Sequence, residues 1–309
     1  RAAVSIEAGL CKYAELNDKI KQELRTKKKV TITAVNGQRY IGCALDAGKT
    51  IQVHGTPGND MACYLNGGMV EVFGNCQDAV GNTMNGGEIV IHGHAGDAMG
   101  YGMRDGQIFV ETNVACRGGI HMKEFEQMKP VLVIGRNAGS FLGEYMAGGT
   151  IVLLGLGMKR GEKLFGTHCA SGMHGGKIFV RGSFPKENIS PNIKVTALTD
   201  ADRQELEGYL KKYCKYFGVS MDEIMKKPFK SWLPPPPDLT QTFTRPTNGI
   251  IIEERATTTR DRRERCSIVC TRNAVFSVYL KIRPPRWPRR RTWLCLPCST
   301  EDRRVAALP

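Results

Sequence analysis

The sequence predicts an all-β fold, a right-handed single-stranded β-helix of about seven coils with short flanking helices. Three observations carry this prediction. Of the 35 glycines in the 309 residues, 31 lie between Gly37 and Gly182. Within that range a pattern of 19 residues repeats, and each copy opens with a short stretch of alternating apolar residues. A fixed period near twenty residues is typical of a solenoid whose coils stack on one another.

The copies are spaced regularly until an insertion interrupts them. They begin at Thr31, Thr50, Met69, Glu88, Gln107, Val131, Thr150 and Lys177. The first four intervals are 19 residues, and residues 120–130 disturb the pattern before it resumes. Each copy is too short for a helix in addition to a strand and two loops, so several short strands per coil are expected. A leucine-rich repeat has a similar period, but the leucine ladder that it needs is absent.

The alternation predicts which side chains line the interior. Apolar pairs are expected to point inward and to stack at about 4.8 Å per coil. These pairs are Ile51/Val53, Val70/Val72, Ile89/Ile91, Ile108/Val110, Val131/Val133, Ile151/Leu153 and Ile178/Val180. Glycines at fixed offsets suit tight corners, and we assign a structural turn role to Gly55, Gly74, Gly86, Gly87, Gly93, Gly135, Gly148, Gly149 and Gly176.

The outward-pointing side chains become largely apolar from the fourth copy onward. We take Val90, Phe109, Leu132, Ile134, Val152 and Leu154 as this contact face. A solvated strand face is normally polar, so an apolar patch of this size indicates a contact. Two interpretations stay open: a later helix of the chain covers the face, or a partner subunit packs on it.

The flanks divide the chain into further segments. Residues 1–30 are expected to form an N-terminal helical segment with an amphipathic helix over 14–29, and residues 31–183 the β-helix. Residues 184–233 are expected to form a helical appendage. Its main helix covers 199–218, with Thr199 or Asp200 as the N-cap and Gly218 at the end, and a further turn covers 222–227. Residues 234–309 form a Pro/Arg-rich tail.

The tail carries most of the positive charge. Residues 240–309 contribute +9 to the formal net charge of +14. Cys266, Cys270, Cys295 and Cys298 match a zinc ribbon weakly because the knuckle glycines are missing. Residues 284–293 resemble a nucleic-acid-binding arm in composition. The rise in Arg, Pro and Trp and the loss of Gly favour disordered or out-of-frame sequence instead, so no nucleic-acid partner is expected.

Two constellations within the repeat could carry chemistry. His92 and His94 could form a metal pair, but no third ligand lies at an obvious offset, and a structural role is favoured. Asn59, Asp78 and Asp97 occupy one column, where stacked acids could bind a cation or act as an acid/base pair. Stacked Asp at a turn more often caps backbone amides. We therefore assign no catalytic, cofactor-binding or metal-binding residue.

Other chemistry is weakly supported by the sequence. The glycine runs lack a nucleotide-binding fingerprint, including at 155–157, and residues 157–166 are expected to form a basic, solvated loop. No apolar stretch approaches ~18 residues, so no membrane span is expected. Seven cysteines are scattered singly through the first 214 residues, which suits reduced thiols in a cytoplasmic protein.

The repeat and its flanks resemble a known family. The glycine-patterned copies, GQRYIG at 37–42, ELNDKI at 15–20 and KKYCKYFGVSMDEIMKKPF at 211–229 are similar to the GXGXG β-helix domain of glutamate synthase in its stand-alone form. The resemblance covers about residues 5–233. It implies a non-catalytic scaffold subunit that holds a glutamine amidotransferase and an FMN-binding synthase subunit in register while the complex makes glutamate from glutamine and 2-oxoglutarate.

The resemblance also bears on cofactors and alternatives. FMN and an iron–sulfur cluster are expected in the partner subunits, and no cofactor is expected in this chain. One subunit of formylmethanofuran dehydrogenase resembles the same β-helix, so an equivalent scaffold in that enzyme is the alternative. A free-standing polysaccharide-active β-helix enzyme is a third interpretation, but it needs a cleft lined by acidic and basic residues that the columns do not supply.

Overall fold

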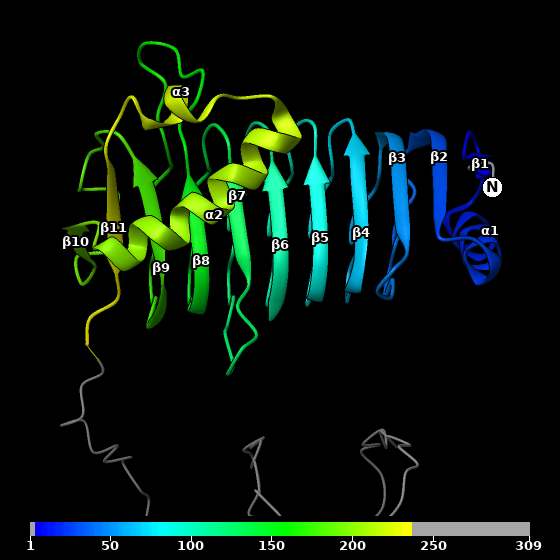
Figure 1. Ribbon diagram of the computed structural model, residues 1–309, viewed down its shortest axis with the longest axis horizontal. Helices are drawn as coiled ribbons and strands as arrows, with labels where there is room; N and C mark the ends of the chain where they lie inside the picture. The colour runs from blue at the N-terminus through cyan, green and yellow to red at the C-terminus, as the bar shows by residue number, and fades with distance from the viewer. Residues whose placement is uncertain (1–3, 237–309) are drawn as a thin grey trace, which may run out of the picture. The chain divides into compact units, whose positions relative to one another are not determined.

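The computed structural model describes residues 4–236, which form one eleven-stranded sheet in a β-solenoid of about six turns (Figure 1). Strands β1 to β9 lie side by side in sequence order and are parallel, and the antiparallel β11 and β10 complete the sheet. The strands are β1 Val4–Glu7, β2 Lys29–Asn36, β3 Thr50–Thr56, β4 Asn66–Phe73, β5 Asn85–Ile91, β6 Asp105–Val110, β7 Val131–Ile134, β8 Ala147–Leu153, β9 Gly175–Arg181, β10 Lys194–Ala197 and β11 Phe229–Leu233. The helices are α1 Tyr13–Thr26, α2 Asp200–Phe217 and α3 Met221–Met225.

The strand register confirms the predicted β-helix. Thr50 pairs with Met69, Glu88 pairs with Gln107, and Gln107 pairs with Val131 across the insertion. The expectation of several strands per coil is wrong: each coil contributes one strand to the sheet, and the other coil-to-coil bridges, such as Ala95 to Val114, are isolated. Corners therefore take up the rest of each coil.

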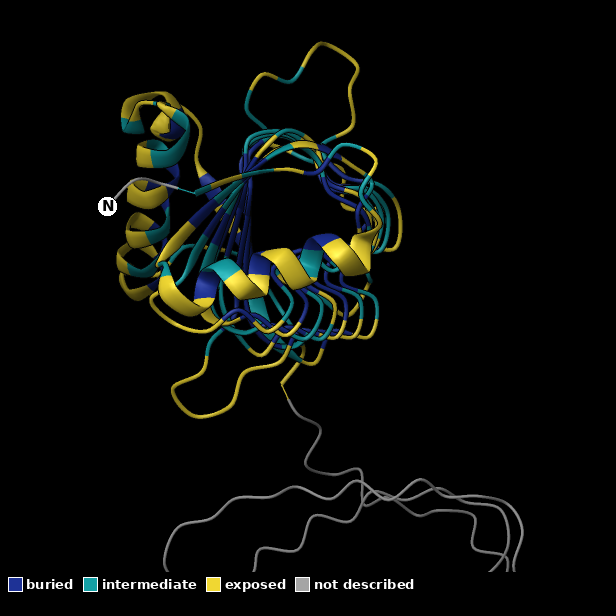
Figure 2. Cartoon of the chain, turned by 90° about the vertical axis from the view of Figure 1, so that its right-hand side faces the viewer, coloured by how far each residue is buried: buried dark blue, intermediate teal, exposed yellow. Residues whose placement is uncertain are grey.

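The interior is a continuous stack of apolar side chains. Figure 2 colours buried residues dark blue, and this colour follows the strands that wall the solenoid. The prediction that Val131 and Val133 point inward is wrong. Leu132 and Ile134 join the interior, and Val131 and Val133 face outward. All four residues of this strand are apolar and buried, so no alternation reveals which of them point inward. The pairing of Gln107 with Val131 decides it, since a slip of one residue exchanges the two faces.

Two left-handed corners recur in successive coils. The first column contains Tyr40, Asp60, Ala79, Ala98, Arg117, Phe141 and His168, and the second contains Ala44, Tyr64, Thr83, Gly102, His121, Tyr145 and Gly172, all with φ between 51° and 65°. In all but the last member of each column, the backbone N–H group binds a carbonyl oxygen of the next coil, as that of His121 does with Glu144 at 3.0 Å. Residues other than glycine rarely adopt this conformation, and here the coil-to-coil hydrogen bonds hold it.

The predicted turn glycines lie where coils approach closely. At Gly87, φ is 94°, and a Cβ would lie 2.2 Å from the carbonyl oxygen of Gly68. At Gly135, a Cβ would lie 2.0 Å from the carbonyl oxygen of Glu111. At six of the other predicted positions a Cβ would lie within 2.6 Å of backbone of the preceding coil, and Gly86 instead has a φ of 154°. A larger residue would force neighbouring coils apart.

Both ends of the solenoid are covered. Helix α1 buries Leu16, Ile20 and Leu24 against the first coil, and it ends three residues earlier than the predicted span. At the other end β11 pairs with β9 and carries the fully buried Trp232. The appendage predicted to be helical thus also contains two strands, which protect the open edge of the last coil.

Candidate functional site

Helix α2 covers the outer face of β6 to β9 (Figure 1). Thr199 and Asp202 form a capping box at its start, and Gly218 ends it with a φ of 67°, as the sequence predicts. Leu206, Leu210 and Tyr213 are buried on the strand-facing side of the helix. They form a second core with Leu154, which follows β8, and with outward residues of the strands, which are Phe109, Val131, Val133, Val152 and Phe179.

The predicted contact face is therefore buried within the chain. Phe109, Val152 and Leu154 lie in the core with α2, which confirms the interpretation that a later helix covers them. The assignment of Leu132 and Ile134 to this face is wrong, because both point into the solenoid. Val90 is also fully buried. None of the six offers exposed area to a partner.

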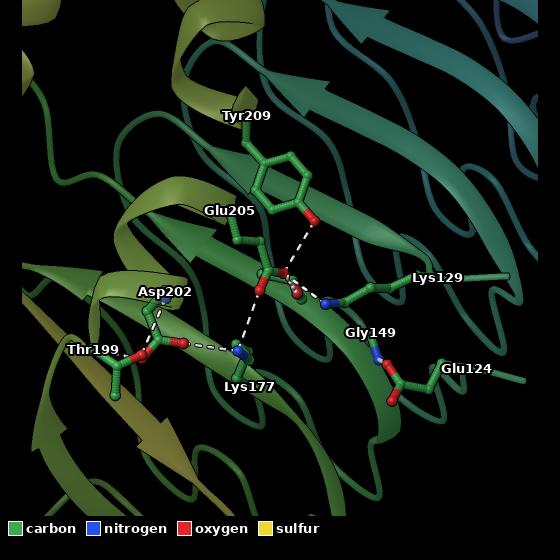
Figure 3. Close-up of polar contacts among 9 residues, drawn as sticks. Glu124, Lys129, Gly149, Lys177, Thr199, Asp202, Glu205 and Tyr209 are labelled. Atoms are coloured by element: carbon green, nitrogen blue, oxygen red, sulfur yellow. Dashed lines mark hydrogen bonds and ion pairs between the residues drawn. The ribbon is translucent and has the colours of Figure 1, made fainter. Parts of the chain in front are cut away.

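A polar network ties the beginning of α2 to the sheet (Figure 3). The carboxylate of Glu205 accepts hydrogen bonds from Lys129 Nζ at 2.8 Å, Thr150 Oγ1 at 2.8 Å and Tyr209 Oη at 3.1 Å. Lys177 Nζ lies 3.2 Å from its other oxygen. Glu205 thus gathers side chains from three separate segments of the solenoid and from its own helix.

Lys177 links this carboxylate to a second one. Its ammonium group donates to Asp202 Oδ1 at 2.7 Å, while Asp202 Oδ2 accepts from the backbone N–H and hydroxyl of Thr199 at 3.0 and 2.8 Å. The helix N-cap and the strand β9 are therefore joined through one buried carboxylate. Fixing the first turn of α2 in this way fixes the direction of the whole helix across the sheet.

The network shifts the pKa values of its members. Burial raises the pKa of Asp202 and Glu205, but hydrogen bonds from Lys177 and Thr199 to Asp202, and from Lys129 and Thr150 to Glu205, outweigh it and hold both below the usual range. Burial lowers the pKa of Lys177, but the two carboxylates outweigh it and raise that pKa. Burial raises the pKa of Tyr209, and the adjacent carboxylate of Glu205 raises it further.

The end of α2 and the segment after it are held by separate polar contacts. Lys212 Nζ donates to Glu88 Oε2 at 2.6 Å and to Gln107 Oε1 at 2.7 Å. Arg181, which is buried, donates to the carbonyl oxygens of Ile224 at 2.6 Å and Glu223 at 2.8 Å. Polar contacts from Asp202 to Ile224 thus bind α2 and α3 to the solenoid.

The column of Asn59, Asp78 and Asp97 caps backbone amides. Asn59 Oδ1 accepts from the N–H of Asp78 at 3.3 Å, Asp78 Oδ1 from that of Asp97 at 2.8 Å, and Asp97 Oδ1 from that of Cys116 at 2.8 Å. Each side chain therefore satisfies a donor in the next coil, which is the turn interpretation of the sequence.

The structure does not bring His92 and His94 together as a pair of metal ligands. His92 Nε2 lies 3.1 Å from Glu71 Oε1, and its ring stacks on Phe73 at 4.8 Å, whereas His94 is exposed. Within residues 4–236 no group of three or more His, Cys, Asp or Glu side chains is arranged to hold a metal ion. The cysteines at 266–298 and the basic segment at 284–293 lie outside the described residues.

Sequence reasoning missed the Glu205 network. The helix was predicted, but its polar partners come from positions 129, 150 and 177, up to 76 residues earlier in the chain. The available signal was the residue at the outward position that opens each repeat. This residue is Val131 in one coil, but it is Thr150 and then Lys177 in the next two coils. Polar residues at that position of an otherwise apolar face indicate a polar partner on the covering helix.

A comparison with protein families identifies the solenoid. The model described as the GXGXG motif matches residues 10–235, which include all helices and strands except β1. The chain belongs to the GXGXG family. The uncharacterized protein MJ1350 of Methanocaldococcus jannaschii is 43% identical to this GXGXG chain over 235 residues, which cover 74% of this chain and 90% of that protein.

Among solved structures, this GXGXG protein is similar to a chain of the formyltransferase/hydrolase complex FhcABCD from Methylorubrum extorquens, crystallised with methylofuran. The identity is 20% and the TM-score 0.49, covering 66% of this chain and 73% of that chain. Among residues 4–236, no helix of the GXGXG chain has the length and apolar character to cross a bilayer.

Proposed function

We propose that this protein is a structural subunit of a glutamate synthase-like complex, in which it positions a glutamine amidotransferase and an FMN-binding synthase subunit. Membership of the GXGXG family and the resemblance of residues 5–233 to the stand-alone domain support this proposal. The complex makes glutamate from glutamine and 2-oxoglutarate, and FMN and an iron–sulfur cluster belong to the partner subunits. The scattered free cysteines fit a reducing compartment, so we place the complex in the cytoplasm.

The observation that carries the proposal is the internal use of charge around α2. The hydrogen bonds and ion pairs of three charged residues, Glu205, Asp202 and Lys177, join the helix to the sheet. This arrangement makes the solenoid and its appendage one unit with fixed outer surfaces. Such a unit suits the task of holding other subunits at set positions, because each coil adds a further row of surface residues.

The test is purification of the tagged full chain from its native host, with mass spectrometry of the proteins that accompany it. Partners that carry FMN and a glutamine amidotransferase are the expected result. Partners that carry a molybdenum or tungsten pterin would assign the chain to a formylmethanofuran dehydrogenase-type complex instead. Glutamate formation by the isolated chain, or stoichiometric FMN binding to it, would overturn the scaffold role.

A further inference from the structure

A surface hollow of about 420 Å³ lies along the second left-handed corner of the solenoid. Its lining includes Tyr101, Arg104, His121, Lys123, Tyr145 and His174. We call these six residues the aromatic–basic corner. They come from four successive coils, so the hollow runs along the stack rather than around one coil.

The aromatic rings of this corner form a ladder. The rings of Tyr101 and His121 lie 5.8 Å apart in a T-shaped arrangement, and those of His121 and Tyr145 lie 5.2 Å apart with an interplanar angle of 15°. Tyr101 is 42% exposed and Tyr145 is 48% exposed. The ladder therefore presents flat apolar area to the outside, supported from within by its own stacking.

The backbone at this ladder is unfavourable for large side chains. His121 and Tyr145 have φ values of 56° and 51°, whereas Gly102 and Gly172 occupy the equivalent corners of the coils on either side. The left-handed conformation costs a residue with a Cβ roughly 1–2 kcal/mol. Glycine satisfies the corner in the adjacent coils, so the fold itself does not require a ring at these two positions. Ala44 and Thr83 occupy the same column of corners with small side chains, so the rings at His121 and Tyr145 are not set by the corner itself and are free to serve a contact outside the fold.

Two exposed positive charges lie beside the ladder. Arg104 and Lys123 occupy equivalent positions of consecutive coils, because their backbone N–H groups bind Met84 and Met103 in the same way. Both side chains are exposed, and Arg104 donates to Asn85 Oδ1 at 3.3 Å. Within residues 4–236 neither forms an ion pair, whereas Arg117 on the other corner pairs with Glu144.

We propose that the aromatic–basic corner binds an acidic segment of a partner chain, with carboxylates on Arg104 and Lys123 and an apolar or aromatic side chain on the exposed rings. The inference rests on the proposed function, for which it names a partner-binding surface. Aromatic residues and arginine are enriched in the centres of protein interfaces. A single-stranded nucleic acid fits less well, because its backbone needs several phosphate contacts and this corner offers two unpaired cations one coil apart.

The test measures binding of a fluorescein-labelled decapeptide of alternating Glu and Tyr to the full chain by fluorescence anisotropy. R104E/K123E is expected to weaken binding at least tenfold. The matched control K159E/R160E makes the same charge change in an exposed loop and is expected to stay within twofold of wild type. An equal loss in both variants would show that only overall charge matters and would overturn the proposal, as would tighter binding of an oligouridylate than of the peptide.

A second measurement locates the peptide on the chain. A benzophenone-bearing version is crosslinked to the full chain, and the modified residues are mapped by mass spectrometry. Crosslinks at 101–123 and 145 are expected, and Y101A/Y145A is expected to reduce them at least threefold. Crosslinks confined to the basic residues 240–309 would overturn the inference. Co-purification of partners with R104E/K123E at wild-type yield would also overturn it, while leaving the proposed scaffold role intact.

Discussion

The hydroxyl group of Tyr213 donates a hydrogen bond to the carbonyl oxygen of Glu111, 2.9 Å away and 102 residues earlier in the sequence. Gly135 lies at the same point, where a Cβ would come within 2.0 Å of both the Glu111 oxygen and the Tyr213 hydroxyl. The docking of α2 and the stacking of two coils thus meet at one residue that has no side chain. A side chain at this corner would therefore disturb both contacts at once.

Gly135→Ala is expected to lower the free energy of unfolding by about 1–3 kcal/mol, because the added methyl group separates the coils or displaces Tyr213. Urea denaturation monitored by circular dichroism measures the effect. Gly208→Ala is the control. It lies in α2, where nothing is within 4 Å of an added Cβ, so it is expected to leave the stability unchanged or to raise it by up to about 1 kcal/mol. Equal effects of the two variants would contradict the packing described here.

Glu205→Gln is expected to lower the free energy of unfolding by about 1–3 kcal/mol, because Lys129 loses its anionic partner and Lys177 loses one of two. Glu207→Gln is the matched control, since Glu207 is exposed on the same helix and forms an i,i+4 ion pair with Lys211. Its loss is expected to stay below about 0.5 kcal/mol. A cost for Glu207→Gln as large as that for Glu205→Gln would argue against the network.

Stability is expected to fall as the solution is acidified. The folded-state pKa values of Asp202 and Glu205 are lowered, so their contribution is present above the ordinary carboxyl range and is lost as the pH falls from about 5 through the folded pKa values. The pKa of Lys177 is raised, so its contribution is complete below about pH 10 and is lost above that. Unfolding free energies from pH 7 to pH 3 measure the acid limb, which should be shallower in Glu205→Gln. An identical slope would exclude Glu205 as a source.

Leu210→Ala is expected to cost about 2–5 kcal/mol, because Leu210 is buried between α2 and the strands and its truncation leaves a cavity. Leu10→Ala is the control, since Leu10 is fully exposed and its truncation is expected to cost almost nothing. Thermal and urea unfolding of both variants provide the measurement. Near-equal stability would mean that α2 is not packed on β6 to β9 as described.

The sheet could be predicted from the sequence because the residues that form each strand and corner are close in sequence and recur in every coil. Strand, glycine corner and apolar pair return at a fixed spacing, and the alternation in β3 and β4 identifies the inward residues directly. In β7 all four residues are apolar because the interior lies on one side and α2 on the other. Without a polar residue to mark the outer face, the choice between Leu132 and Val133 depended on pairing across an insertion, and the prediction failed there.

The polar attachments of α2 could not be predicted for a different reason. Helix propensity and caps located the helix to within about one residue at each end. The face of the solenoid on which α2 packs depends on the route of the connecting residues 182–199. Tertiary contacts, and not a local sequence pattern, set that route. Glu205 and Lys129 are therefore ordinary charged residues in the sequence, and only the fold brings them together.

The copies differ in length while the sheet does not. Equivalent backbone or side-chain contacts join residues 19 apart in most coils, 24 apart at Asp105 and Lys129, and 27 apart at Ser140 and Thr167. The extra residues leave the stack at the corners, and the strands on both sides keep their pairing. Such a scaffold can acquire or lose surface segments one at a time by short in-frame insertions and deletions. Epitopes or fluorophores attached at 125–128 or 159–162 are accordingly expected to leave the pairing of the strands unchanged.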